Sequence, residues 1–232
     1  MLLFHAELDS SHSASTTLVP DPTLYSTFLE SRPDALEVAA IEFIISMNKE
    51  HPSLRTHIVH LSSAAALPLI RDAKAAGLPL TVETCFHYLC LTATTIPDGR
   101  PEFKCCPPIR SAENQNLLWD ALIDGTIDFV VSDHSPCVGS LKCLDTGDIM
   151  KAWGGIGGLG LGLSLLWTEA RKRGNNMGRI VDWLSARPAC HAGLQSRKGR
   201  IEPGKDADFV VFDPLVQFIV CVDTVLHDIL IL

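Results

Sequence analysis

The sequence lacks any dense cluster of lysine and arginine. It has 19 Lys and Arg against 27 Asp and Glu in 232 residues, so the formal net charge is -8 at pH 7. Its most basic stretch, EARKRG at 169–174, is typical of the end of a helix. Because binding to a phosphate backbone needs clustered cationic side chains, this composition argues against a nucleic-acid partner.

A leader and a long apolar run are also missing. The opening residues, MLLFHAELD, carry no cationic segment, and their apolar run ends after four residues. The longest weakly polar stretch, residues 154–167, is too short and too rich in glycine to span a bilayer. We therefore predict a cytoplasmic protein with no membrane partner.

The cysteines do not form a pattern that indicates disulfides. All eight are scattered through a medium-sized chain. Cys85, Cys90, Cys105 and Cys106 gather in one region, where a structural zinc is an alternative, but they contain no C-x-x-C pair. We expect reduced, unremarkable thiols, as in a cytosolic protein.

Short apolar runs alternate with helical patterns along the chain. Strands are predicted at 1–4, 55–60, 78–85 and 127–133, with one more at the end of 199–213. Helices are predicted at about 33–48, 63–77, 112–125, 156–173 and 177–194. The alternation favours an α/β fold, in which repeated β/α units form a parallel sheet covered on both faces.

Three of the predicted strands end in a residue that can bind a metal. His5, His60 and Asp133 each follow an apolar run directly. In parallel α/β folds, sites form where strands end at their carboxyl side. Imidazole and carboxylate together suit zinc or a similar divalent ion. The alternatives are hydrogen-bonded core histidines and a structural carboxylate paired with a basic residue.

Six segments carry a family resemblance when they are taken together and in order. They are FHAE, HIVHLSS, KCCPPIR, VSDHSP, MKAWGGI and GRIEPGKDADFVVFD, within residues 1–213. This combination resembles the cyclic amidohydrolases, particularly the members that open the five-membered ring of allantoin to give allantoate. Alternatives are a dihydropyrimidinase or hydantoinase of the same family and a non-catalytic scaffold that retains the fold.

The resemblance implies a metal-dependent (β/α)8 TIM-type barrel. Residues 1–196 correspond to its C-terminal half, strands five to eight, and residues 197–232 to the start of a small β-sandwich with a divergent apolar tail. His5 and His60 match the ligands of the second metal. Asp133 matches a ligand of the first metal that also takes a proton from the bridging water.

Two loops match segments that contact the substrate. One contains Cys106, where the family usually has serine, and the other contains Gly154 and Gly155, which would let a backbone approach closely. Cys85 and His87 follow a strand near the expected mouth of the barrel but are not among the implied ligands.

Some features of the family are not found in this sequence. The resemblance implies an H-x-H pair on barrel strand one and a carboxylated lysine on strand four, and neither is present; Lys104 and Lys151 are poor substitutes. We therefore expect a fragment or alternative gene product of a longer enzyme, inactive or partner-dependent by itself. The longer enzyme would bind two zinc ions, with cobalt or manganese as alternatives, and form a homotetramer.

Two further patterns favour structural roles. His134 adjoins Asp133 and so points to the other side of the strand, where a supporting contact is expected. Gly155, Gly157 and Gly160 match G-x-G-x-x-G, but no convincing strand precedes them, which argues against a dinucleotide site. We predict close helix packing at this glycine-rich stretch.

Overall fold

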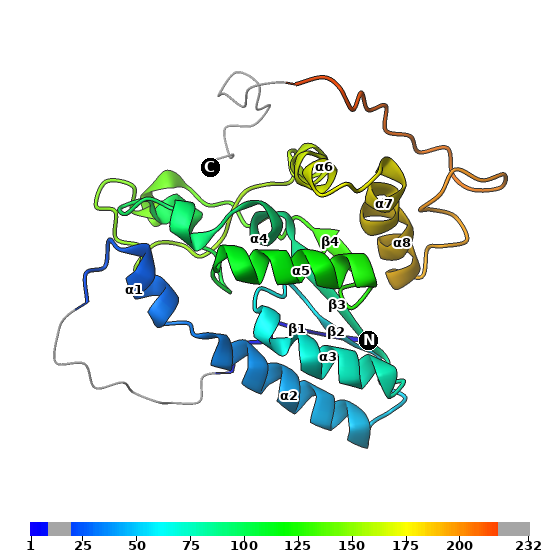
Figure 1. Cartoon of the computed structure of the whole chain (residues 1–232), viewed down its shortest axis with the longest axis horizontal. Coiled ribbons are helices and arrows are strands. Elements are labelled where there is room, and N and C mark those ends of the chain that lie inside the picture. Colours follow the sequence, from blue (N-terminus) through cyan, green and yellow to red (C-terminus); the bar gives the residue numbers. More distant parts are fainter. Residues whose placement is uncertain (9–19, 218–232) are drawn as a thin grey trace.

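A parallel four-stranded sheet forms the centre of the computed structural model (Figure 1), which describes residues 1–8 and 20–217. The strand order follows the sequence. The strands are β1 (Leu2–Phe4), β2 (Thr56–Ile58), β3 (Leu80–Cys85) and β4 (Phe129–Val131). The parallel sheet of β/α units predicted from the alternating pattern is confirmed.

The strand register aligns the four strands at a common level. His57 of β2 pairs with Leu3 on one side and Thr81 on the other. Between β3 and β4, Cys85 pairs with Val131. The carboxyl ends of the strands therefore reach the same edge of the sheet, which is the edge where the predicted ligands follow.

Eight α-helices are formed by the described residues. They are α1 (Tyr25–Glu30), α2 (Asp34–Glu50), α3 (Leu67–Ala75), α4 (Phe86–Cys90), α5 (Ala112–Asp124), α6 (Gly162–Lys172), α7 (Met177–Val181) and α8 (Arg187–His191). A π-helical turn, Asp182–Ala186, joins α7 to α8. Figure 1 shows α2, α3 and α5 along one side of the sheet, with α6 to α8 grouped beyond β4.

Local signals explain where α5 begins and ends. The Ser111 side chain accepts a hydrogen bond from the backbone N–H of Asn114, which caps the first turn. Gly125 ends the helix at a φ of 86°, a conformation that glycine adopts without steric cost. These two residues fix the helix that precedes β4.

Alternating strand residues divide the sheet into an apolar and a polar side. Ile58 and Val82 are fully buried in one apolar cluster with residues of α2, α3 and α5. On the other side, Nδ1 of His57 lies 2.8 Å from Thr81 Oγ1, and Nε2 lies 3.1 Å from Glu83 Oε2. The His191 ring of α8 is 4.2 Å from the His57 ring. The strands thus carry a polar layer in which His57 is buried and its polar neighbours are half-buried.

Several predicted elements differ from those in the structure. The strand expected at the end of 199–213 is wrong for the described residues, because this segment has no neighbouring strand, and Val211 is fully exposed. The helix predicted from 156 begins only at Gly162, since glycine disfavours helix before that point. The short helices α1 and α4 were not predicted. None of the helices in 1–8 and 20–217 combines the length and apolarity needed to cross a membrane.

Candidate metal centre

His5 and His60 meet at the carboxyl edge of the sheet. Nδ1 of His5 lies 3.0 Å from Nε2 of His60, with the ring planes inclined at 70°. His60 is buried and takes a φ of 41°, which turns its side chain out of the strand direction. The structure therefore brings together two imidazole nitrogens that sequence analysis selected from separate strands.

Glu7 orients the His5 ring. Its Oε2 lies 2.8 Å from Nε2 of His5 and 2.6 Å from Nη1 of Arg32. Burial raises the pKa of Glu7, but the hydrogen bond from His5 and the Arg32 charge outweigh it and hold that pKa below its usual value. An ionised Glu7 accepts a hydrogen bond from the Nε2–H group of His5. In this tautomer the lone pair of His5 is on Nδ1 and is directed at His60.

Asp133, the third ligand predicted from the sequence, follows β4. It is half-buried and takes a φ of 43°. Burial lowers the pKa of His60. The negative charge of Asp133 raises that pKa, whereas the neighbouring His5 lowers it further, and the net effect is a lowered pKa. His60 is therefore neutral at physiological pH, the form in which imidazole binds a metal.

Cys85 and His87, predicted to lie near the mouth of the barrel but not to be ligands, join the same edge. Cys85 ends β3 and His87 lies in the first turn of α4, and both are buried. Their donor atoms and a carboxylate oxygen of Asp133 all lie within 4.8 Å of one another. The ends of all four strands and one short helix therefore contribute donors to this edge of the sheet.

The two predicted substrate loops are in contact. A Cβ placed on Gly154 would lie 2.8 Å from Sγ of Cys106, and one on Gly155 would overlap Ser135. The Gly155 N–H donates to the backbone oxygen of Lys104 at 2.9 Å. The close approach that these glycines permit is thus between protein segments. Their contact with substrate stays a prediction.

The glycine-rich stretch does not pack as predicted. Gly158 and Gly160 have open space where a Cβ would stand, so helix packing is wrong for these positions. The glycine that does pack against a helix is Gly162, where a Cβ would overlap the Phe86 ring of α4. His134, in contrast, accepts a hydrogen bond on Nδ1 from the Leu159 N–H at 3.2 Å, the supporting contact expected of it.

Two lysines hold the loops together. Nζ of Lys142, which sequence analysis did not select, donates to the backbone oxygens of Lys104 and Trp153 at 3.1 and 2.9 Å. Nζ of Lys104 donates to the backbone oxygen of Met150 at 2.8 Å. Burial lowers the pKa of both lysines. These contacts support the prediction that Lys104 does not replace the bridging lysine.

A buried ion pair fixes the chain after His60. Glu37 of α2 accepts the backbone N–H groups of Ser62 and Ser63 at 2.9 and 3.0 Å. It also accepts Nη2 of Arg110 at 2.9 Å, with 2% and 6% of the two side chains exposed. Removing one member of such a pair typically costs about 3–5 kcal/mol. The sequence offered no signal for this pair beyond the presence of Arg110 in the KCCPPIR segment.

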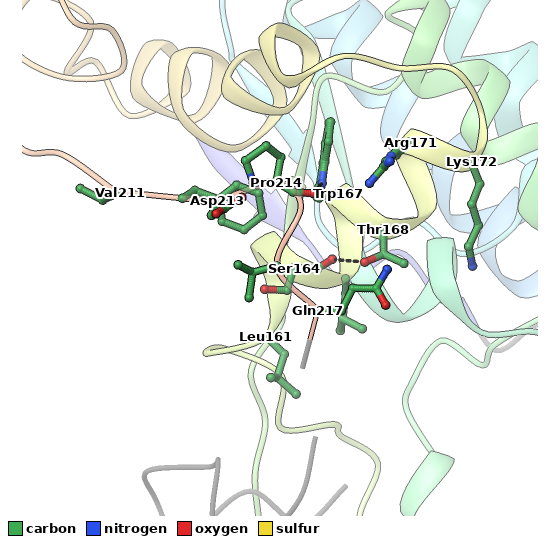
Figure 2. A pocket seen from close by; sticks show the side chains of 13 residues that line it. Leu161, Ser164, Trp167, Thr168, Arg171, Lys172, Val211, Asp213, Pro214 and Gln217 are labelled. Carbon is green, nitrogen blue, oxygen red and sulfur yellow. Dashed lines mark hydrogen bonds between the residues drawn. The ribbon is translucent and has the colours of Figure 1, made fainter. Parts of the chain in front are cut away.

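The pocket drawn in Figure 2 lies elsewhere, between α6 and residues 211–217. Trp167 donates from its indole nitrogen to the Pro214 oxygen at 3.2 Å, and its ring meets Phe212 edge-on. The lining contains no histidine or cysteine. Its residues are therefore not part of the candidate metal centre.

The fold and these donors define the class of protein to which the chain belongs. The chain is a parallel α/β protein with candidate divalent-metal ligands at the carboxyl edge of its sheet. Residues 25–228 match the Amidohydrolase family. The chain belongs to this family of metal-dependent hydrolases, which confirms the resemblance drawn from the six sequence segments.

Relatives of known name are similar over nearly all of this chain. It is 50% identical over 215 residues to the allantoinase of Saccharomyces cerevisiae, covering 92% of this chain and 46% of that protein. It is 53% identical over 220 residues to the allantoinase of Streptomyces avermitilis, covering 95% and 48%. The chain therefore spans about half the length of these relatives.

Solved structures of similar fold are hydantoinase-type enzymes. The dihydropyrimidinase from Brevibacillus agri NCHU1002 is 32% identical with a TM-score of 0.79, covering 87% of this chain and 45% of that one. The D-hydantoinase from Bacillus sp. AR9 is 33% identical with the same TM-score and the same coverage. The fold is thus of the TIM-barrel type found in these enzymes.

Proposed function

We propose that the protein is the metal-binding part of an allantoinase, which hydrolyses the cyclic amide of allantoin to allantoate. The convergence of His5 and His60 at the carboxyl edge, where the charge of Asp133 acts on His60, is the observation that carries this proposal. Sequence identities of 50% and 53% to proteins named allantoinase indicate allantoin as the substrate. Residues 1–196 would then form strands five to eight of a (β/α)8 barrel. The sandwich segment, 197–232, stays a prediction: its expected first strand is not formed in the described residues, and 218–232 lie outside them.

The donor set fits a divalent cation. Nδ1 of His5 and Nε2 of His60 converge, and Glu7 selects the tautomer of His5 that leaves its Nδ1 free to bind. We infer zinc as the ion, two per subunit in the complete enzyme, with cobalt or manganese as alternatives. When bound, such ions lower the pKa of a shared water and polarise the amide carbonyl.

Asp133 would move the proton that hydrolysis requires. Its carboxylate takes a proton from the attacking water while the water oxygen bonds to the carbonyl carbon. As the carbon–nitrogen bond breaks, Asp133 returns that proton to the leaving ring nitrogen, so the carboxylate is regenerated. His5 and His60 would hold the cation in position. The Cys106 and Gly154–Gly155 loops would bind the small-molecule substrate, and the subunits would form a homotetramer.

A chimera provides the test, because the chain covers about half of its relatives. The matched segment of the Saccharomyces cerevisiae allantoinase is replaced by this chain, and hydrolysis of allantoin, hydantoin and dihydrouracil is measured with zinc supplied. We expect allantoin to be the preferred substrate. Turnover of hydantoin or dihydrouracil alone would favour the hydantoinase alternative, to which the similar solved structures are related by family. A folded chimera that binds zinc and hydrolyses none of them would favour the non-catalytic scaffold.

A further inference from the structure

Cys85, His87 and Asp133 form a cluster of three different donor types, here called the thiol cluster. A sulfur, a ring nitrogen and a carboxylate oxygen lie within 4.8 Å of one another. Cys85 ends β3, His87 lies on α4 and Asp133 follows β4. The thiol cluster shares Asp133 with the candidate metal centre, but neither of its other two donors is a ligand that the family resemblance implies.

An unpartnered nitrogen in the thiol cluster indicates a missing partner. His87 is 6% exposed, and its Nε2 is buried with no hydrogen-bond partner among the described residues. A buried polar atom without a partner costs about 1–3 kcal/mol, so such atoms are rare and need an explanation. A cation bound at this nitrogen would remove the cost.

The donor types of the thiol cluster suit a cation that binds sulfur strongly. A buried thiol sulfur and a buried imidazole nitrogen stand close to one carboxylate oxygen. Hard oxygen-seeking ions such as magnesium gain nothing from a thiol, whereas zinc and cadmium do.

We propose that the thiol cluster is a binding site for a thiophilic divalent cation, held by Cys85 sulfur, a His87 ring nitrogen and an Asp133 oxygen. On binding, the Cys85 sulfur–hydrogen bond breaks, a sulfur–metal bond forms and the proton passes to solvent, with no change of oxidation state. An ion here occupies the carboxylate that hydrolysis needs. The site is therefore inhibitory, a consequence that rests on the proposed function.

Cadmium is the probe, because its bond to a thiolate gives an ultraviolet charge-transfer absorption. The purified protein is titrated with Cd²⁺, and the absorption is compared among variants. We expect saturation at one equivalent in the wild type, loss of the absorption in C85S, and affinity lower by about tenfold or more in H87Q and D133N. C90S is the matched control, since Cys90 is a half-buried thiol of α4 outside the cluster.

One further variant makes the result decisive. H60N removes a histidine of the metal centre and should leave the absorption unchanged; its loss would make His60 a ligand of the thiol-bound cation and overturn the proposal. Absorption that persists in C85S, or its absence in the wild type, would also overturn it. Circular dichroism checks folding, and half-buried D133N serves if C85S does not fold. The absorption needs no turnover, so failure of the chimera to hydrolyse allantoin leaves this test intact.

Discussion

Nδ1 of His5 lies 3.0 Å from Nε2 of His60, although 55 residues separate them in the chain. The pairing of Phe4 with Ile58 brings the ends of β1 and β2 to the same level, and the positive φ of His60 directs its ring toward His5. In the absence of an ion, the His60 N–H can donate to the His5 lone pair. An ion would replace that proton, which makes the pair a preformed half of a metal site.

The first prediction concerns Glu7, which we infer to be a positioning residue for His5. The E7Q variant keeps the size of the side chain but removes the charge that holds the Nε2 proton. We expect zinc affinity to fall about 10- to 100-fold, as is typical when the partner of a metal-binding histidine is lost. Competition with a chromophoric chelator measures the affinity.

Nitrogen-15 NMR of His5 supplies a readout that a general loss of stability would not produce. The wild type should show the ring protonated on Nε2, and E7Q should show a mixture of tautomers. E113Q, which removes an exposed carboxylate from α5, is the control for charge alone. Unchanged affinity and tautomer in E7Q would show that Glu7 does not orient the ring.

The second prediction is that D133N abolishes turnover of allantoin in the chimera. Asparagine has nearly the same shape but cannot accept the proton from water. A loss of at least about 10²-fold in kcat is expected for removal of a general acid–base group. The thermal midpoint should stay near that of D145N, a control in an exposed loop. Normal kcat in D133N would remove Asp133 from the proton transfer.

The third prediction tests the packing of α6 on α4. In G162A the added methyl group would overlap the Phe86 ring, one residue before His87. Overpacking of this kind costs about 1–3 kcal/mol in free energy of unfolding. In G160A the added methyl group would have no atom within 4 Å. This variant should change the free energy of unfolding by less than about 0.5 kcal/mol. Equal urea midpoints for the two variants would contradict the described contact.

The fourth prediction concerns acid stability and Glu169 of α6. Burial raises the pKa of this carboxyl, but hydrogen bonds from Lys172 and Arg173 outweigh it and lower the pKa below its usual 4.5. The pairing therefore stabilises the folded state fully at pH values above the pKa of the unfolded chain. This stabilisation is lost as the pH falls through the lowered pKa of the folded state. It should amount to about 1 kcal/mol or less, because the pair is partly exposed.

Urea unfolding between about pH 5 and pH 3 measures this contribution. E169Q should lose less stability over that range than the wild type does. E42Q removes an exposed carboxylate from α2 and should follow the wild type. A parallel decline in E169Q and the wild type would show that the pairing contributes nothing.

Local features could be predicted from the sequence because their causes are local. The four apolar runs that became strands, and the helix between Ser111 and Gly125, depend on residues close together in the chain. The same holds for His5, His60 and Asp133, since a polar residue that follows an apolar run stands at a strand end whatever its neighbours are. The strand expected at the end of 199–213 was wrong because a strand needs a bonding neighbour, which no local pattern reveals.

Contacts between distant segments were decided by the tertiary structure alone. Glu37 and Arg110 pair across 73 residues, and Cys85 meets Asp133 only because β3 and β4 lie side by side in the observed register. Short apolar and polar patterns determine which segments are buried, and so the sequence by itself determined the β/α order and the candidate ligands. Strand register and helix packing then decided which of the buried donors share one site, because those positions are set by the whole core.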